Sequence, residues 1–362
     1  MRILYDSQIF TMQPFGGISR YFNKLALYNE DMFESSVSGK FSDNIYVHSL
    51  SKMKTFPIKS YFKGKGRIQN YINLLADKRT IRKEEFDVYH PTYYFVPEYP
   101  KNKPTVITAH DFIHEKFPEF FPVKDKTSEA KKTSFEKATR IIAISKKTKE
   151  DLLKYFPFVD ERRIDVVYHA IEWEPRVKQQ LSFDFDKPYI LFTGQRGGYK
   201  NFLPFCKAVA PILKENDLYL VCTGQPFNTE EQETLQSLQI LERIKNLFAT
   251  EEELRELYEN ALCFVFPSMY EGFGFPILEA FVSKTPCLLA NASCFPEIAG
   301  NGALYFDPNS IDDMKNAIQR VVQSEALRSD LIKKGSERFE AFSMKNMIEG
   351  TVMTYNNAIN MY

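Results

Sequence analysis

The chain has 362 residues, which exceeds the usual size of a single hydrophobic core and predicts two domains. With 44% apolar and 26% charged residues and no apolar run long enough to cross a bilayer, the composition is that of a soluble globular protein without a membrane span. The net charge of zero hides a division: residues 1–170 carry 29 Lys and Arg against 21 Asp and Glu, whereas the remainder carries 18 against 26.

Short β-rich runs alternate with helical patterns from the N-terminus onward, which is typical of βα units with parallel sheets. The first residues enter a strand-like pattern without the zones of a signal peptide, which predicts a cytoplasmic protein. The strands expected in the first domain are 3–5, 88–90, 105–109, 141–144 and 164–167. Those expected in the second domain are 189–193, 218–223, 263–266, 286–289 and 303–305.

The polar, proline-bearing segment 172–187 shows no clear periodicity and predicts an interdomain linker. It separates an N-terminal domain of residues 1–171 from a C-terminal domain of residues 188–342. A last helix within 343–362 can dock on either domain, and we expect it to cross back to the N-terminal one.

Most of the positive charge lies between Lys40 and Lys83, where eleven basic residues face only Asp43 and Asp77. This stretch includes an expected helix over 68–83 with both apolar and basic residues. A solvated helix beside a Gly-Lys loop explains the pattern and is the favoured interpretation. Contact with anionic lipid or a lipid-phosphate acceptor, and hence a peripheral position at the inner face of the membrane, is the alternative.

Five cysteines, all in the second half, are an odd number without C-x-x-C spacing, and several lie in apolar runs. We interpret them as reduced core residues. Because the five histidines are also scattered, neither a zinc site nor a redox pair is predicted.

Glycine-rich turns follow two of the expected strands, at the edge where parallel sheets bind ligands. The first contains Gly16 and Gly17, whose backbone can approach an anion at a helix start, although a permissive turn is at least as good an explanation. The second runs from Gly194 to Asn201 and includes Arg196 and Lys200. Two cations at a strand end suit a diphosphate better than a nicotinamide, and a solvated basic turn is the alternative.

The richest motif follows the expected strand 263–266 and ends with Glu-Gly-Phe-Gly-Phe-Pro-Ile-Leu-Glu, in which Glu271 and Glu279 are eight positions apart. Pro276 suits the first turn of a helix, and we expect Glu279 in that turn. Two carboxylates separated by a loop can accept hydrogen bonds from different hydroxyls of one extended ligand. Without a ligand, Glu279 would complement the helix dipole and Glu271 would be a solvated loop residue.

This motif resembles the E-x7-E signature of the retaining glycosyltransferases of family four, which have the two-domain GT-B fold. The resemblance extends over nearly the whole chain, from Gly16-Gly17 through His110-Asp111 and Ser145, which opens a helix, to the two cations and the two glutamates. It implies two Rossmann-like α/β domains whose parallel sheets face a central cleft. The segment 166–172 departs from the family, which often has an Asn-Gly-Val-Asp turn there, so the hinge is not carried over.

The resemblance also implies roles for single residues. Glu271 and His110 lie at the donor sugar, Glu279 binds the ribose, and Arg196 and Lys200 neutralise the diphosphate. Backbone amides of Gly17, Phe273 and Gly274 face the donor, and a structural histidine is the alternative for His110. The base is expected near Phe248 to Glu253, where Thr250 and Glu253 form a capping box.

The implied reaction transfers a hexose of the mannose or glucose type, with retention, from a donor such as GDP-mannose or UDP-glucose. The acceptor is a glycan or a lipid-linked glycan, as in polysaccharide biosynthesis, and no cofactor, metal or nucleic acid is required. A nucleotide-sugar 2-epimerase of the same fold and an inactive nucleotide-sugar-binding protein are the alternatives. An NAD-dependent oxidoreductase is disfavoured because neither half has a GxGxxG turn between strand and helix.

Overall fold

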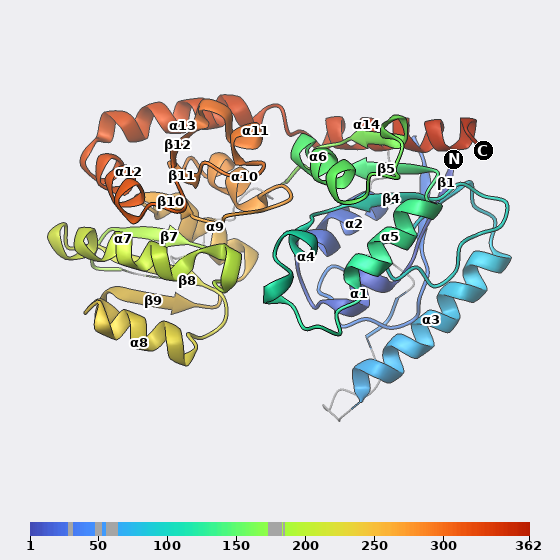
Figure 1. Ribbon diagram of the computed structural model, residues 1–362, viewed down its shortest axis with the longest axis horizontal. Helices are drawn as coiled ribbons and strands as arrows, with labels where there is room; N and C mark the ends of the chain where they lie inside the picture. The colour runs from blue at the N-terminus through green and yellow to red at the C-terminus, as the bar shows by residue number, and fades with distance from the viewer. Residues whose placement is uncertain (28–31, 48–52, 56–63, 173–182, 184) are drawn as a thin grey trace. The chain divides into compact units, whose positions relative to one another are not determined.

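The computed structural model describes residues 1–27, 32–47, 53–55, 64–172, 183 and 185–362. These residues form two compact units (Figure 1). Unit 1 comprises Met1–His169 together with Lys345–Tyr362, and unit 2 comprises Ala170–Met344. Most of the expected linker, namely residues 173–182 and 184, lies outside the described residues.

Unit 1 is built on parallel strands in two groups of three, ordered β2-β1-β3 and β4-β5-β6. An isolated parallel bridge between Tyr89 and Thr105 joins β3 to the segment that leads into β4. The strands are β1 (Arg2–Tyr5), β2 (Glu34–Val37), β3 (Val88–His90), β4 (Val106–Ala109), β5 (Arg140–Ala143) and β6 (Ile164–Val166).

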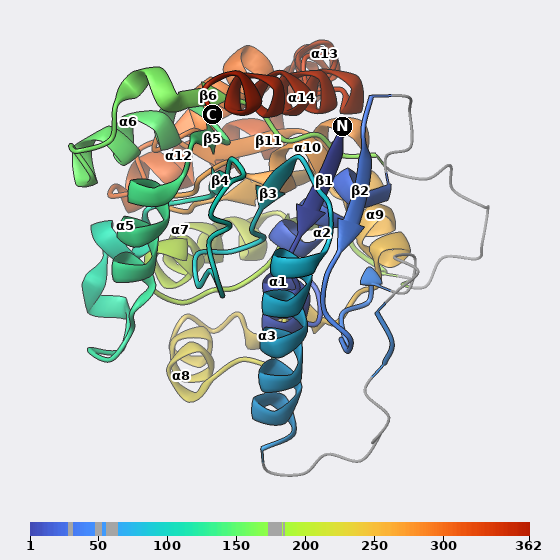
Figure 2. The same cartoon turned by 90° about the vertical axis from the view of Figure 1, so that its right-hand side faces the viewer.

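Helices connect these strands and pack on them (Figures 1 and 2). They are α1 (Gln8–Met12), α2 (Gly17–Leu27), α3 (Lys65–Lys83), α4 (Ile113–Lys116), α5 (Thr127–Lys137) and α6 (Lys146–Tyr155), with the short 3-10 helices η2 (Pro118–Phe120) and η3 (Glu161–Arg163). The C-terminal helix α14 (Met344–Asn360) also packs on this unit, where the hydroxyls of Tyr355 and Tyr5 lie 3.0 Å apart.

Unit 2 contains one parallel sheet of six strands in the order β12-β11-β10-β7-β8-β9. They are β7 (Tyr189–Phe192), β8 (Tyr219–Thr223), β9 (Ile244–Leu247), β10 (Cys263–Phe266), β11 (Cys287–Ala290) and β12 (Ala303–Phe306). The chain moves outward from β7 to β9 and then returns to the other side of β7 with β10. The order therefore reverses between β7 and β10, and open parallel sheets bind ligands at the carboxyl ends of strands beside such a reversal.

The helices of unit 2 alternate with these strands, as βα units require. They are α7 (Phe202–Glu215), α8 (Thr229–Ser237), α9 (Glu251–Asn260), α10 (Phe275–Val282), α11 (Phe295–Ala299), α12 (Ile311–Gln323) and α13 (Glu325–Phe339), with η4 (Gly198–Lys200), η5 (Leu241–Arg243) and η6 (Gly300–Gly302).

All ten expected strands are present within one or two residues of their predicted ends, which confirms the α/β prediction. Two strands were not predicted, β2 and β9. Both are edge strands whose residues are largely half-exposed, so they lack the apolar run that marks a buried strand.

The five cysteines are buried and none is part of a disulfide, as expected for reduced core residues. In the part of the chain that the structure describes, no helix combines the length and the apolarity needed to cross a membrane.

Candidate functional site

The reversal point of the unit 2 sheet carries an ion pair between two predicted site residues. Lys200 ends η4 after β7, and Glu271 lies in the loop after β10. The Lys200 Nζ and Glu271 Oε1 are 2.5 Å apart, and the two side chains are only 17% and 13% exposed. A cation and a carboxylate thus meet where ligands bind in open parallel sheets.

Hydrogen bonds to neighbouring loops hold Glu271 in place. The Glu271 N–H donates to the Ser293 hydroxyl at 3.3 Å, and this hydroxyl donates to the Glu271 carbonyl at 2.6 Å. The Met269 N–H donates to the Tyr199 carbonyl at 2.8 Å, which ties the two loops of the ion pair together. Sequence analysis missed Ser293, because its role depends on a left-handed backbone (φ +53°) after β11.

Phe273 and Gly274 form the turn into α10. Gly274 has φ +96°, and a Cβ there would lie 3.0 Å from the Ile277 side chain, so a larger residue would be strained and crowded. The Phe273 side chain is buried, and its ring lies 5.9 Å from that of Phe342. Gly274 has no side chain and that of Phe273 is buried, so a ligand would meet the backbone of this turn. The contact of that backbone with the donor stays a prediction.

Glu279 is the fifth residue of α10 and is buried. Sequence analysis placed Glu279 in the first helical turn after Pro276. It lies instead in the second turn, because the helix already begins at Phe275. The Tyr258 hydroxyl donates to the Glu279 carboxylate at 3.3 Å and lies 3.1 Å from the hydroxyl of Thr193, the residue that follows β7. Burial, together with the nearby Glu279 carboxylate, raises the pKa of Tyr258.

Arg196 is engaged inside unit 2. Its guanidinium forms a buried salt bridge with Glu231 of α8 at 3.0 Å and donates to the carbonyls of Gln225 and Pro226 at 2.5 and 3.0 Å. A further N–H points to Asn246 Oδ1 at 3.4 Å. Because a guanidinium has five N–H donors, few remain for a diphosphate, and the geometry favours an internal role for this cation.

The stretch from Phe248 to Glu253, expected near the base, runs from the end of β9 into the first turn of α9. Thr250 and Glu253 form the predicted capping box, with both reciprocal hydrogen bonds present. Phe248 is 62% exposed and therefore offers an aromatic face. The capping box is confirmed, whereas the base contact stays a prediction.

In unit 1, His110 follows β4 and is buried. Its backbone N–H donates to the Tyr94 hydroxyl at 2.9 Å, and its ring stacks on that of His169 with 6.2 Å between the ring centroids. Burial lowers the pKa of His110 to about 4, so the imidazole is neutral at pH 7. Its Nδ1 has no hydrogen-bond partner among the described residues, which leaves a buried polar atom available to a ligand.

Lys131 of α5 is a residue that sequence analysis missed. It is 1% exposed, and its ammonium donates to Glu115 Oε2 at 2.9 Å and to the Asp111 carbonyl at 2.8 Å. Although burial opposes the effect, the Lys131 charge lowers the pKa of Asp111. A lysine twenty positions after Asp111 gives no local signal, but it shares a helical face with Thr127, Ser134 and Phe135, which are also buried.

Gly17 is the first residue of α2. The Gly16 carbonyl accepts from the Arg20 N–H at 3.0 Å and from the Ser19 hydroxyl at 3.0 Å. The turn thus opens a helix as expected, and its contact with an anion stays a prediction. Ser145 likewise opens α6 and accepts from the Thr148 N–H at 2.9 Å, as predicted.

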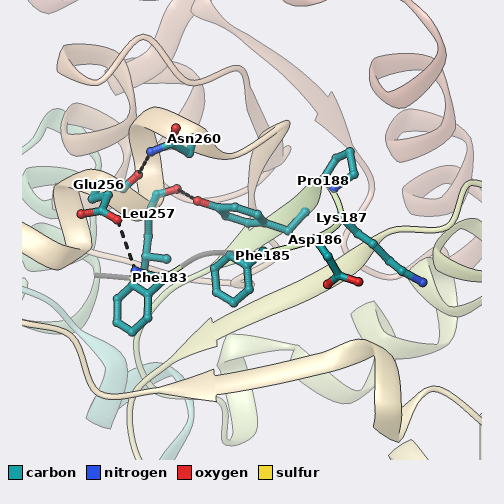
Figure 3. A pocket seen from close by; sticks show the side chains of 9 residues that line it. Phe183, Phe185, Asp186, Lys187, Pro188, Glu256, Leu257 and Asn260 are labelled. Carbon is teal, nitrogen blue, oxygen red and sulfur yellow. Dashed lines mark hydrogen bonds between the residues drawn. The ribbon is translucent and has the colours of Figure 1, made fainter. Parts of the chain in front are cut away.

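A separate pocket of about 310 Å³ lies at the amino end of β7, where Tyr189 begins the strand (Figure 3). Glu256 Oε1 accepts from the Phe183 N–H at 3.5 Å on its wall. Because Lys200 and Glu271 follow the carboxyl ends of their strands, this pocket belongs to the opposite edge of the sheet and not to the candidate site. It is lined by Phe183, Phe185, Asp186, Lys187, Pro188, Tyr189, Glu256, Leu257 and Asn260.

Two family models match adjoining parts of the chain. The model described as glycosyl transferases group 1 matches residues 174–338, and the one described as glycosyltransferase family 4 matches residues 15–174. Together they account for most of the sequence, and every predicted site residue lies inside one of them.

Curated relatives include two O-antigen chain mannosyltransferases. The chain is 26% identical over 288 residues to mannosyltransferase B of Escherichia coli, an alignment that covers 74% of both proteins. It is 27% identical over 218 residues to RfbU of Salmonella typhimurium, where the alignment spans only 60% of each protein.

Solved structures resemble the chain over nearly its whole length. Sucrose-phosphate synthase from Thermosynechococcus elongatus has a TM-score of 0.74 at 18% identity, and the match covers 98% of both chains. Anabaena HepE in complex with UDP and glucose has a TM-score of 0.75 at 16% identity, with 98% of this chain and 99% of that one covered. At these identities the likeness establishes the fold, and it confirms the predicted GT-B class.

Proposed function

Because the chain belongs to the glycosyl transferases group 1 family, we propose that it is a retaining glycosyltransferase. It moves a hexose from a nucleoside-diphosphate sugar to a glycan or lipid-linked glycan. The observation that carries the proposal is the Lys200–Glu271 ion pair at the reversal point of the unit 2 sheet. Mannose is the first sugar to test, since two relatives bear the name O-antigen chain mannosyltransferase.

In this proposal Lys200 acts on the donor diphosphate. Negative charge grows on the leaving nucleoside diphosphate as the bond to the sugar breaks, and a cation already in place stabilises it without reorganisation. Backbone N–H groups of the Phe273-Gly274 turn at the start of α10 add the positive end of a helix dipole.

Glu271 faces the opposite charge. The sugar carbon becomes positive as the diphosphate leaves, and a carboxylate beside it stabilises that charge. The acceptor attacks from the face that the leaving group vacates, and a departing phosphate oxygen takes the acceptor proton, which retains the configuration. Glu279 holds the ribose hydroxyls, and Tyr258 orients its carboxylate.

Arg196 serves this site as a positioning residue. Its bonds to Glu231 and to the carbonyls of Gln225 and Pro226 hold the turn after β8 against the turn after β7. His110 and Gly17 of unit 1 are proposed to contact the donor, His110 as a neutral imidazole that hydrogen-bonds a sugar hydroxyl.

Calorimetry with a panel of donors tests the proposal. We expect GDP-mannose or a UDP-hexose to bind, and incubation of the bound donor with glycan acceptors to give a product whose anomeric configuration, read by NMR, matches the donor. Epimerised donor without transfer would instead identify an epimerase, and binding without turnover would identify an inactive binding protein.

We also propose that the reaction needs no metal ion. Among the described residues, no group of three or more His, Cys, Asp or Glu side chains is arranged to hold one. Turnover is therefore expected to persist in EDTA, and a complete loss that a divalent cation restores would contradict this. A cytoplasmic location, with peripheral contact at the inner face of the membrane, completes the proposal and is tested by fractionation.

A further inference from the structure

Helix α3 has its polar and apolar faces reversed relative to an ordinary surface helix. Its buried residues are Gln69, Asn73, Asp77 and Ile81, at intervals of four. Three of these four are polar, whereas a helix on a globular protein normally buries an apolar stripe and exposes a polar one. The helix lies along the edge of unit 1 (Figures 1 and 2).

The buried polar side chains all have partners. Asn73 accepts from the Phe41 N–H at 3.0 Å and donates to the Phe41 carbonyl at 2.6 Å. Asp77 accepts from the hydroxyls of Ser7 and Ser38 at 2.7 and 2.6 Å. These bonds fix the rotation of α3 about its axis, because turning the helix would leave buried polar groups unpaired.

The opposite face exposes large apolar side chains. Ile68, Tyr71 and Leu75 are 47%, 62% and 51% exposed and follow one another at intervals of three and four residues. They therefore form one continuous stripe along the helix. Leu74 beside them is 36% exposed.

Cations flank this stripe. Arg67 precedes Ile68, while Lys78 and Arg79 follow Leu75 by one turn. These three cations form no ion pair with any residue that the structure describes, whereas Arg82 on the next turn pairs with Glu98 at 2.7 Å. Asp43 pairs instead with Lys65 at 2.8 Å. Positive charge thus borders the apolar side chains at both ends.

We propose that the outer face of α3, defined by Arg67, Ile68, Tyr71, Leu75 and Arg79, docks on an anionic phospholipid bilayer. The apolar side chains enter the boundary between headgroups and acyl chains, and the cations meet lipid phosphates. This inference rests on the proposed function in one respect: transfer to a lipid-linked acceptor explains why the protein would contact a membrane. Sequence analysis favoured a solvated helix for this stretch, and the reversed faces of α3 are the observation that supports the alternative of lipid contact.

Charge decides between a bilayer and a second copy of the chain. A twofold contact would place the same face on both copies and bring the unpaired cations of one against those of the other. Such like charges repel in a desolvated interface, whereas an anionic lipid surface complements them.

Sedimentation with phosphatidylcholine vesicles, prepared with and without phosphatidylglycerol, tests the proposal on the full-length protein. We expect binding only to the anionic vesicles, weakening as salt rises because the attraction is screened. The double variant Arg67→Glu/Arg79→Glu should bind at least about tenfold more weakly. Tyr71→Ser/Leu75→Ser should also lose binding, through the apolar contact.

A matched control makes the same charge change elsewhere. Lys207 and Lys214 are exposed on α7 of unit 2, and Lys207→Glu/Lys214→Glu should bind vesicles like the wild type. Equal losses in both charge variants would mean that net charge alone drives binding, which overturns the assignment to α3. Absence of binding to anionic vesicles at low salt overturns it too, as does a dimer that Tyr71→Ser/Leu75→Ser dissolves while vesicles remain unbound.

Donor binding separates this inference from the proposed function. The α3 variants should bind nucleoside diphosphate and act on a soluble acceptor as the wild type does, since no site residue is changed. If vesicles are not bound but soluble acceptor is used, only the docking inference fails. If vesicles are bound but no donor is, the proposed function fails.

Discussion

Exchange of Glu271 for Gln probes the chemistry of the candidate site most directly. The amide keeps the size of the side chain and removes the charge that faces Lys200. We expect kcat to fall by about 10²–10³, the effect of removing one preorganised charge-stabilising group in other enzymes. Binding of free nucleoside diphosphate, in contrast, should not weaken.

The geometry of the ion pair determines how much the Glu271→Gln exchange changes the affinity for nucleoside diphosphate. Two unit charges 2.5 Å apart attract each other by about 7 kcal/mol at an effective dielectric constant of 20. Desolvation of both ions offsets most of this attraction, because the side chains are only 17% and 13% exposed. In the wild type, a diphosphate that binds Lys200 must break the ion pair with Glu271, and this costs the net free energy of the pair that remains after desolvation. Glu271→Gln should therefore tighten diphosphate binding, by about tenfold for each 1.4 kcal/mol released.

Titration calorimetry with GDP and UDP measures the diphosphate affinity of the Glu271→Gln variant, and Lys200→Met is the matched variant. Loss of a hydrogen bond to a charged group costs about 1.5–3 kcal/mol, so Lys200→Met should weaken diphosphate binding by about ten- to a hundredfold and leave nucleoside binding unchanged. The double variant completes a cycle that gives the coupling between the two side chains. A different result would be an equal loss of diphosphate affinity in Glu271→Gln and Lys200→Met, with the kcat of Glu271→Gln unchanged. Glu271 would then not face the sugar, and the proposed position of the reacting carbon would be wrong.

Three further predictions concern buried groups. Arg196→Lys keeps the charge but loses the planar fork that holds Glu231, so thermal denaturation should show a loss of about 1–3 kcal/mol; unchanged stability with weaker diphosphate binding would favour direct contact of Arg196 instead. Glu279→Gln should raise the donor KM more than it lowers kcat, since the ribose is held alike in the ground and transition states, and the opposite split would place Glu279 at the reacting centre. Burial, and the nearby carboxylate of Asp6, raise the pKa of Asp77 to about 7. The folded state therefore binds this proton more tightly than the unfolded state, and stability should fall as the pH rises from about 4 through about 7. Asp77→Asn should flatten that decline in denaturation measured against pH, and an unchanged decline would assign it to other groups.

Local patterns in the sequence were sufficient for much of the fold. Strand β10 is a short apolar run bounded by turns, and both β10 and β3 were predicted with the ends they have. The helix starts at Ser145 and Thr250 follow from side chains that cap their own helix three residues on. Edge strands β2 and β9 have one side open to solvent, so their composition does not distinguish them from loops.

The sequence likewise predicted part of the candidate site, and the tertiary structure decided the rest. The sequence alone identified Lys200 and Glu271 as residues at strand ends, because glycine-rich turns and the spacing of the glutamates are local features. It did not determine that these two side chains, 71 positions apart, form an ion pair, since that depends on β10 pairing with β7 rather than with β9.

Other partners were also decided only by tertiary structure. Arg196 looked like a second free cation at a strand end, yet α8 supplies Glu231 from 35 positions away. Helix α3 read as a solvated basic helix, because its sequence does not say which face meets the protein. Ser7 and Ser38 bind Asp77 from other elements and so turn Ile68, Tyr71 and Leu75 outward. Sequence periodicity determines which residues share a face, whereas the long-range order of strands determines what each face meets.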